Sequence, residues 1–206
     1  MTRTLRAVLI TLGDPMQLTG GYLFHRRLAE LAPAHAATLD FESFQERPFP
    51  WGVVDARQVI RRVEARQPDA VIMDSIVAWC LAFAAPRPPM LGMLHQPPGG
   101  IDFPRARTNV QRRLDRLAYR HLRRLLVASE SLADDLRAGG LAPARIKVVP
   151  PGRDVAAHLG PPPGDLRLGR RASFLSVGNW MERKGSLSLL EAFAALEPLT
   201  GTLHLV

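Results

Sequence analysis

Short apolar runs alternate with amphipathic stretches from the beginning of the chain to about residue 150. The apolar runs have the length of β-strands and are bounded by Gly, Pro or polar residues, whereas the stretches between them repeat apolar side chains at helical spacing. Strands that are apolar almost throughout are typical of a parallel sheet covered by helices on both faces. The pattern therefore predicts an α/β fold with a doubly wound parallel sheet. The expected strands are 5–12, 36–41, 70–73, 90–95, 125–129 and 146–149.

A proline-rich segment at 160–164 interrupts this alternation. Consecutive prolines fit neither a helix interior nor a central strand, so we expect a linker at 161–169 between a first domain at 1–160 and a second domain at 170–206. One βαβ unit is too small to form a core of its own, and we therefore expect the second domain to be truncated or to dock on another structure. Its expected strand, helix and strand are 173–177, 186–196 and 202–206.

Composition excludes several classes of protein. The chain of 206 residues is 47% hydrophobic and 22% charged, as a packed globular protein is. Its one cysteine, Cys80, excludes a disulfide framework, and its histidines lie too far apart to predict a metal site. The longest uncharged run, Ser75 to Pro86, is too short to cross a membrane. We expect a cytoplasmic protein without a metal or cofactor.

The net charge of +8 comes almost wholly from arginine and is concentrated in one expected helix, 105–124. There Arg112, Arg116 and Arg120 lie among Val110, Leu114 and Leu117. Such a helix could rest on anionic lipid head groups at the inner face of the membrane, bind an acidic partner, or present an ordinary solvated face. Nucleic acid is a weaker candidate, since only 6% of the residues are aromatic and no stacking platform accompanies the arginines.

A second basic feature is the loop 178–185, which joins an expected strand to a helix and contains Asn179, Arg183 and Lys184. Unpaired N–H groups at a helix N-terminus favour an anion, and Arg with Lys would complement a diphosphate. The loop is not a P-loop, because Arg183 and Gly185 stand where that motif has Gly and Ser or Thr. A solvated basic turn explains the same residues equally well.

Two further features follow expected strands of the first domain. Gly20 and Gly21 open a helix whose apolar side chains are Phe24, Leu28 and Leu31, and they would let a phosphate or sugar approach the backbone. A flexible turn with positive φ angles is the alternative. His95 ends the strand at 90–95, where ligands bind in open parallel sheets. A histidine with a purely structural role remains the alternative there.

Taken together, these segments resemble glycosyltransferase family 4, whose members are retaining enzymes of the GT-B fold. The resemblance rests on three stretches that span nearly the whole chain in the family's order. They are the glycine pair with His25-Arg26-Arg27-Leu28-Ala29-Glu30-Leu31, the segment from Val127 to Asp154, and Phe174 to Asn179 followed by Arg183-Lys184-Gly185 and Leu189 to Phe193.

The resemblance implies two Rossmann-like lobes, the second incomplete, that transfer a sugar from a nucleotide diphosphate to a hydroxyl acceptor without a metal. Gly20 and Gly21 match the family's glycine loop near the donor phosphates. His95 matches the family's active-site histidine, and Lys184 matches the lysine that binds the donor diphosphate. Asn179 stands where many members have arginine, which Arg183 could replace. The family's paired glutamates would lie beyond Val206. The alternative is a non-catalytic lobe that binds an anionic membrane or an acidic partner through the arginine helix.

Overall fold

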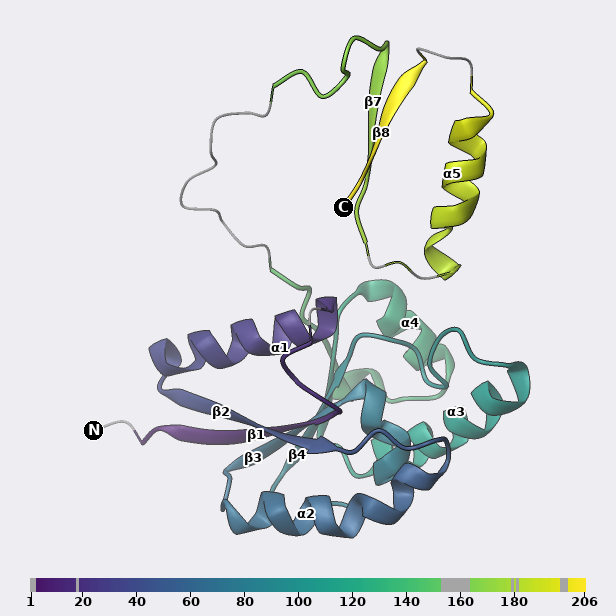
Figure 1. Ribbon diagram of the computed structural model, residues 1–206. Helices are drawn as coiled ribbons and strands as arrows, with labels where there is room; N and C mark the ends of the chain where they lie inside the picture. The colour runs from purple at the N-terminus through teal and green to yellow at the C-terminus, as the bar shows by residue number, and fades with distance from the viewer. Residues whose placement is uncertain (1–2, 18, 153–163, 179, 181, 197–199) are drawn as a thin grey trace. The chain divides into compact units, whose positions relative to one another are not determined.

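The chain folds into two units, shown in a computed structural model that describes residues 3–17, 19–152, 164–178, 180, 182–196 and 200–206 (Figure 1). The first unit comprises residues 1–152 and the second residues 153–206. The beginning of the second unit, residues 153–163, lies outside the described residues. The domain limits at 160 and the linker at 161–169 therefore stay predictions.

The first unit is built on one parallel sheet of six strands in the order β2-β1-β3-β4-β5-β6. Strand β2 pairs with one edge of β1, and β3, which follows in the sequence, pairs with the other edge. The strand order therefore reverses between β1 and β3. This arrangement confirms the predicted doubly wound parallel sheet. Ligands of such sheets bind beyond the carboxyl ends of the strands, where the order reverses. The strands are β1 Leu5–Leu12, β2 Ala37–Phe44, β3 Ala70–Asp74, β4 Met90–Leu94, β5 Arg124–Val127 and β6 Ile146–Val148.

Helices cover both faces of this sheet, and Figure 1 shows α1 and α2 on opposite sides of it. Both faces of the sheet are therefore buried. The consecutive residues Leu9 and Ile10 of β1 point to opposite faces, and both are 0% exposed. Helix α4 begins after Ser129, whose Oγ accepts the N–H of Leu132 at 3.2 Å, and ends at Gly139. The α-helices are α1 Gly20–Leu31, α2 Ala56–Ala65, α3 Arg105–Arg120 and α4 Glu130–Ala138.

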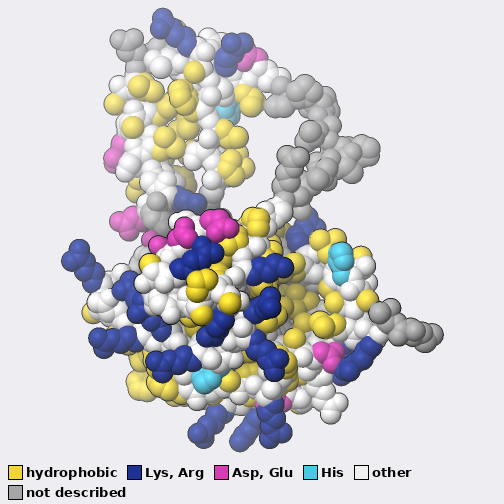
Figure 2. Space-filling view, turned by 180° about the vertical axis from the view of Figure 1, so that it is seen from behind, with side chains coloured by type: hydrophobic (Ala, Val, Ile, Leu, Met, Phe, Trp, Pro, Cys, Tyr) yellow, Lys and Arg dark blue, Asp and Glu magenta, His cyan; other side chains and the backbone are white. Residues whose placement is uncertain are grey.

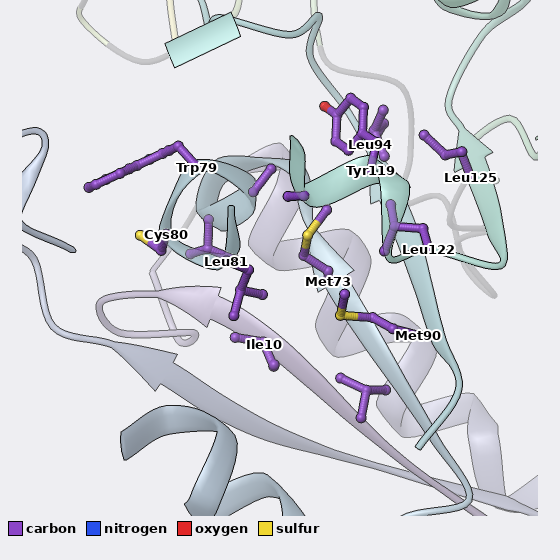
Figure 3. Packing of buried hydrophobic residues seen from close by; sticks show 14 of the residues in the cluster. Ile10, Met73, Trp79, Cys80, Leu81, Met90, Leu94, Tyr119, Leu122 and Leu125 are labelled. Atoms are coloured by element: carbon purple, nitrogen blue, oxygen red, sulfur yellow. The ribbon is translucent and has the colours of Figure 1, made fainter. Parts of the chain in front are cut away.

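The hydrophobic core joins α2, α3 and the 3-10 segment η3 (Ser75–Leu81) to the central strands (Figure 3). Leu81 and Met73 are 0% exposed, and Tyr119 is 1% exposed. Each fully buried side chain of this size contributes about 1.5–3 kcal/mol relative to an exposed one. The apolar sequence Val77 to Leu81 is therefore a short buried segment, and its packing holds the chain in place directly after β3.

Helix α3 is rotated relative to its expected orientation. The apolar pattern predicts burial of Val110, yet Val110 is 48% exposed, and the buried residues are Gln111, Asp115, Ala118 and Tyr119. Tyr119 and Ala118 belong to the core cluster that includes η3, and this packing outweighs the burial of two polar side chains on the same face. Asp115 thus lies inside the protein and is 2% exposed.

The second unit contains two parallel strands, β7 Ala172–Ser176 and β8 Gly201–Leu205, with α5 Ser186–Ala194 between them in sequence. The predicted strand, helix and strand are each found at nearly their expected positions. Gly201 is the one buried residue in the described part of this unit, while Leu175 and Val177 are 66% and 68% exposed. The described part of this unit therefore forms no core of its own, as expected for a single βαβ motif.

Candidate functional site

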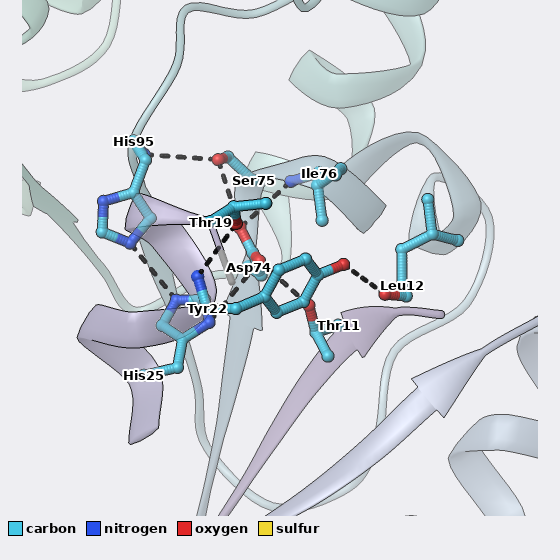
Figure 4. Close-up of polar contacts among 9 residues, drawn as sticks. All are labelled: Thr11, Leu12, Thr19, Tyr22, His25, Asp74, Ser75, Ile76 and His95. Carbon is cyan, nitrogen blue, oxygen red and sulfur yellow. Dashed lines mark hydrogen bonds and ion pairs between the residues drawn. The ribbon is translucent and has the colours of Figure 1, made fainter. Parts of the chain in front are cut away.

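Four polar side chains meet at the carboxyl edge of the sheet, where its strand order reverses (Figure 4). Thr11 comes from the end of β1, Asp74 from the end of β3, and His95 directly follows β4. The fourth, His25, comes from the second turn of α1. Segments far apart in the sequence thus place two imidazoles, a carboxylate and a hydroxyl at the position where open parallel sheets bind ligands.

The N-terminus of α1 is open beside this cluster. Thr19 is the N-cap, and its Oγ1 accepts the N–H of Tyr22 at 3.5 Å. Gly20 and Gly21 form the first turn, and a Cβ atom built on either glycine would have no described atom within 4 Å. Neither glycine has a positive φ, so the alternative of a left-handed turn does not hold. The backbone here is accessible to an anionic ligand, which the unpaired N–H groups of a helix N-terminus favour.

The two histidines face each other through their Nε2 atoms at 3.2 Å. His25 is fully buried, and His95 is partly exposed. The ring of Phe24 meets that of His95 edge to face, with the centroids 5.2 Å apart. Burial lowers the pKa of both histidines, while the nearby Asp74 acts in the opposite direction on each. Both imidazoles are therefore neutral at pH 7, and each can donate one hydrogen bond and accept another.

Asp74 links the histidines to the strands. Its Oδ2 accepts the hydroxyl of Thr11 at 3.0 Å and lies 3.8 Å from Nδ1 of His25. Its Oδ1 accepts the hydroxyl of Ser75 at 3.3 Å and the N–H of Ile76 at 3.2 Å. Asp74 is therefore the N-cap of η3, and its two oxygens also connect His25 with Thr11 and Ser75.

Side chains of α3 hydrogen-bond to the loop that follows His95. The backbone N–H of Gly99 donates to Oδ2 of Asp115 at 2.7 Å. Burial raises the pKa of Asp115 to about 7, although the N–H groups of Gly99 and Trp79 act in the opposite direction. Arg112 reaches the same loop, because its Nε donates to the carbonyl of Pro98 at 3.4 Å. Helix α3 thus fixes the segment that carries the exposed histidine of the site.

The arginines predicted to contact a membrane or acidic partner therefore differ in their surroundings. Arg112 is half-buried and binds Pro98 and the side chain of Asn109. Arg116 reaches the end of α4, since its Nη2 would lie 3.3 Å from a Cβ built on Gly139. Arg120 is exposed on the last turn of α3.

The basic loop of the second unit is described in part. Lys184 is exposed at the end of the short 3-10 segment Glu182–Lys184, and its Cε would lie 3.9 Å from a Cβ built on Gly178. The side chain of Lys184 therefore extends toward the glycine at the start of the loop. The loop ends at Gly185, which adopts a left-handed conformation with φ of 67° and is the N-cap of α5. Asn179 and the side chain of Arg183 lie outside the described residues.

Sequence reasoning did not identify His25 and Thr11 as parts of the site. The apolar residues Phe24, Leu28 and Leu31 defined the expected buried face of α1, whereas Tyr22 and His25 are its buried residues and Leu31 is 59% exposed. A signal was present, because His25 falls one helical turn after Gly21 and so faces the same edge of the sheet. Within the described residues, no group of three His, Cys, Asp or Glu side chains is arranged to hold a metal ion.

Comparison with known proteins identifies the family to which the sequence is similar. A sequence profile of glycosyltransferase family 4 matches residues 18–157, which is more than half of the chain. No curated protein sequence matches significantly. None of the described helices has the length and apolar character that crossing a membrane requires.

Solved structures of glycosyltransferases share the fold. The chain resembles HepE of Anabaena in complex with UDP and glucose, with a TM-score of 0.65, 16% identity, and 98% of this chain and 60% of that chain covered. It also resembles the lipopolysaccharide outer core galactosyltransferase WaaB in its apo form, with a TM-score of 0.59, 13% identity and coverage of 98% and 60%. The likeness confirms the α/β, Rossmann-like fold of GT-B glycosyltransferases. The chain spans about three fifths of the length of these two proteins.

Proposed function

Because the chain belongs to glycosyltransferase family 4, we propose that the protein transfers a sugar from a nucleotide diphosphate donor to a hydroxyl acceptor with retention of the anomeric configuration. One observation carries the proposal. The paired histidines lie beside the open N-terminus of α1, at the edge of the sheet where the strand order reverses. That edge is where a ligand of this fold class binds.

The structural neighbours support a nucleoside diphosphate as the donor's leaving group. HepE is described in complex with UDP, with UDP and glucose, and with UDP-glucose. The spinosyn rhamnosyltransferase SpnG is described with thymidine diphosphate, at a TM-score of 0.51, 16% identity and coverage of 98% of this chain and 64% of that chain. We assign contacts with the donor to Gly20 and Gly21 in the first unit and to Asn179, Arg183 and Lys184 in the second.

In this mechanism the chain acts through electrostatics. Negative charge grows on the diphosphate as the bond to the sugar breaks. A lysine ammonium group and helix N-terminal N–H groups placed beforehand stabilise that charge more in the transition state than in the ground state. Lys184 supplies the ammonium group, Gly20 and Gly21 supply N–H groups, and no metal is assigned to the site. His95, neutral at pH 7, contacts the sugar or the acceptor hydroxyl near the reacting carbon.

Lysine replacement tests the proposal, because the chain contains two lysines. In protein expressed from its full reading frame, Lys184→Ala should lower kcat/KM for nucleotide sugars on the order of 100-fold, as loss of one charge-stabilising donor does. Lys147→Ala is the matched control, since Lys147 is exposed on the edge strand β6. Transfer that is equally fast in both variants would remove Lys184 from the donor site.

A second candidate function is association with an anionic membrane surface at the cytoplasmic side, and exposed arginines favour it. Arg113, Arg120, Arg123 and Arg124 are exposed, and none forms an ion pair with a described residue. Figure 2 shows many dark-blue basic side chains on one side of the first unit, with fewer acidic ones among them. Near anionic lipid, each such side chain contributes about 1 kcal/mol. Such binding would bring the protein to a lipid-linked acceptor.

A further inference from the structure

The two site histidines share a single hydrogen bond, and its direction has chemical consequences. Nε2 of His25 lies 3.2 Å from Nε2 of His95. Both rings are neutral, so one Nε2 must carry the proton and the other must accept it. Whichever ring donates through Nε2 has an unprotonated Nδ1. The direction of this bond therefore decides whether His95 offers a substrate an acceptor or a donor at Nδ1.

The carboxylate of Asp74 determines the direction. All three of its hydrogen-bond partners are donors: the hydroxyls of Thr11 and Ser75 and the N–H of Ile76. The hydroxyl of Ser75 accepts the backbone N–H of His95 at 3.3 Å, which leaves its own hydrogen for Asp74. Both oxygens of Asp74 therefore act as hydrogen-bond acceptors. The charge of Asp74 acts on the neighbouring His25, whose pKa it raises against the effect of burial.

Nδ1 of His25 faces that charge. It lies 3.8 Å from Oδ2 of Asp74, is fully buried and has no hydrogen-bond partner among the described residues. An N–H at this position is attracted to the carboxylate, whereas a lone pair would be repelled by it. The neighbouring aromatic side chains do not compete for this nitrogen, since the hydroxyl of Tyr22 donates to the carbonyl of Leu12 instead.

We propose that His25 is a positioning residue, which Asp74 holds with its proton on Nδ1 and which therefore accepts the Nε2 proton of His95. His95 is then the Nε2–H form, and its Nδ1 lone pair accepts a hydrogen bond from a hydroxyl group of the sugar or acceptor. Figure 4 shows the Nε2 atoms directed at one another, with the other nitrogen of His95 not involved in the pair. The assignment of this ligand rests on the proposed function, whereas the proton positions do not.

The proton positions can be read by nuclear magnetic resonance on the 206-residue chain without any substrate. Long-range ¹H–¹⁵N correlation distinguishes protonated from unprotonated ring nitrogens by their ¹⁵N chemical shifts. At neutral pH we expect Nδ1 of His25 and Nε2 of His95 to be protonated and the other two nitrogens to be unprotonated. The opposite assignment, with the proton of the shared bond on His25, would overturn the proposal.

Variants test whether Asp74 and His25 determine these proton positions. Asp74→Asn should shift His95 toward the Nδ1–H form, because an amide N–H no longer attracts the Nδ1 proton of His25. His25→Phe should leave His95 as a mixture of both forms. His25→Gln should retain the Nε2–H form, since its amide oxygen can accept the proton of His95. His35→Phe is the control, because His35 is exposed at the end of a 3-10 segment outside the cluster. Unchanged proton positions in both Asp74→Asn and His25→Phe would refute the roles of Asp74 and His25.

Kinetics separate this inference from the proposed function. In the protein from the full reading frame, His25→Phe should lower kcat about tenfold while KM for the donor changes little, and His25→Gln should recover most of the rate. If no nucleotide sugar is turned over by the unaltered protein, the proposed function fails, yet the proton positions measured without substrate still decide the inference. A rate in His25→Gln as low as that in His25→Phe would contradict the positioning role.

Discussion

The backbone N–H of Gly99 donates to the buried carboxylate of Asp115 at 2.7 Å, across 16 residues of sequence. This contact joins the loop after His95 to the middle of α3. Arg112, one turn earlier on the helix, contacts the neighbouring Pro98. A helix that the sequence offered chiefly as a basic surface is therefore also the support of the candidate active-site loop.

Asp115 predicts an unusual dependence of stability on pH. Burial raises its pKa to about 7, well above that of the same carboxyl in the unfolded chain. The folded state therefore holds this proton more tightly, so the contribution to stability is complete below about pH 4 and is lost as pH rises through 7. Asp115→Asn keeps an acceptor for Gly99 and removes the titration. Its free energy of unfolding should fall less between pH 5 and pH 8 than that of the unaltered chain.

The measurement is urea denaturation at a series of pH values, with each difference of one pKa unit corresponding to about 1.4 kcal/mol. Asp40→Asn is the control, because it removes the same charge from an exposed position on β2. If Asp115→Asn and Asp40→Asn show the same slope with pH, Asp115 does not titrate in this range.

The conformation of Gly99 predicts that a side chain at this position will destabilise the loop. Its φ of +98° lies in the region that side chains rarely adopt, and an added Cβ would come within 2.8 Å of the Thr108 carbonyl oxygen. Gly140 has a similar φ of +87° but open space around it. Gly140→Ala should therefore cost about 1–2 kcal/mol from backbone strain alone, and Gly99→Ala should cost clearly more. Chemical denaturation measures both, and equal costs would show that the loop moves freely away from Thr108.

The strands were predictable because buried strands of a parallel sheet are apolar along their whole length, as Ala7 to Ile10 are. The faces of α1 and α3 were not, because their buried positions include His25, Gln111 and Asp115. An apolar pattern counts such residues as exposed. They are buried because partners distant in sequence contact them, as His95 does 70 residues after His25. His95, Gly20 and Gly21 could be named as candidate site residues because they follow expected strands. The contact between His25 and His95 could not be predicted without the fold.

The histidine pair predicts that stability falls in acid. Burial lowers the pKa of both rings below the unfolded value of 6.5. The unfolded chain therefore binds protons more readily, so stability is fully present above pH 6.5 and is lost as pH falls through the folded-state pKa values. His95→Gln removes one of these sites, and its free energy of unfolding should fall less between pH 7 and pH 5. His35→Gln, at an exposed position, is the control. A steeper acid loss in His95→Gln than in the unaltered chain would contradict this account.

The exposed arginines of α3 and the segment after it predict binding to anionic vesicles. Combining Arg113→Glu, Arg120→Glu and Arg124→Glu reverses three charges that form no ion pair with described residues. Each arginine near such a surface contributes about 1 kcal/mol, so the triple variant should lose at least 100-fold in partitioning. Co-sedimentation with vesicles of phosphatidylglycerol and phosphatidylcholine measures the effect.

The matched control combines Arg57→Glu, Arg61→Glu and Arg87→Glu, which changes the net charge equally at exposed positions in and beyond α2. If net charge alone attracts the protein, both triple variants will lose binding to the same degree, because exposed charges act over about 10 Å at ordinary salt wherever they lie. A loss confined to the α3 variant identifies the surface that faces the lipid. Arg112 stays unchanged in both variants, since its contact with Pro98 would couple vesicle binding to the loop that carries His95.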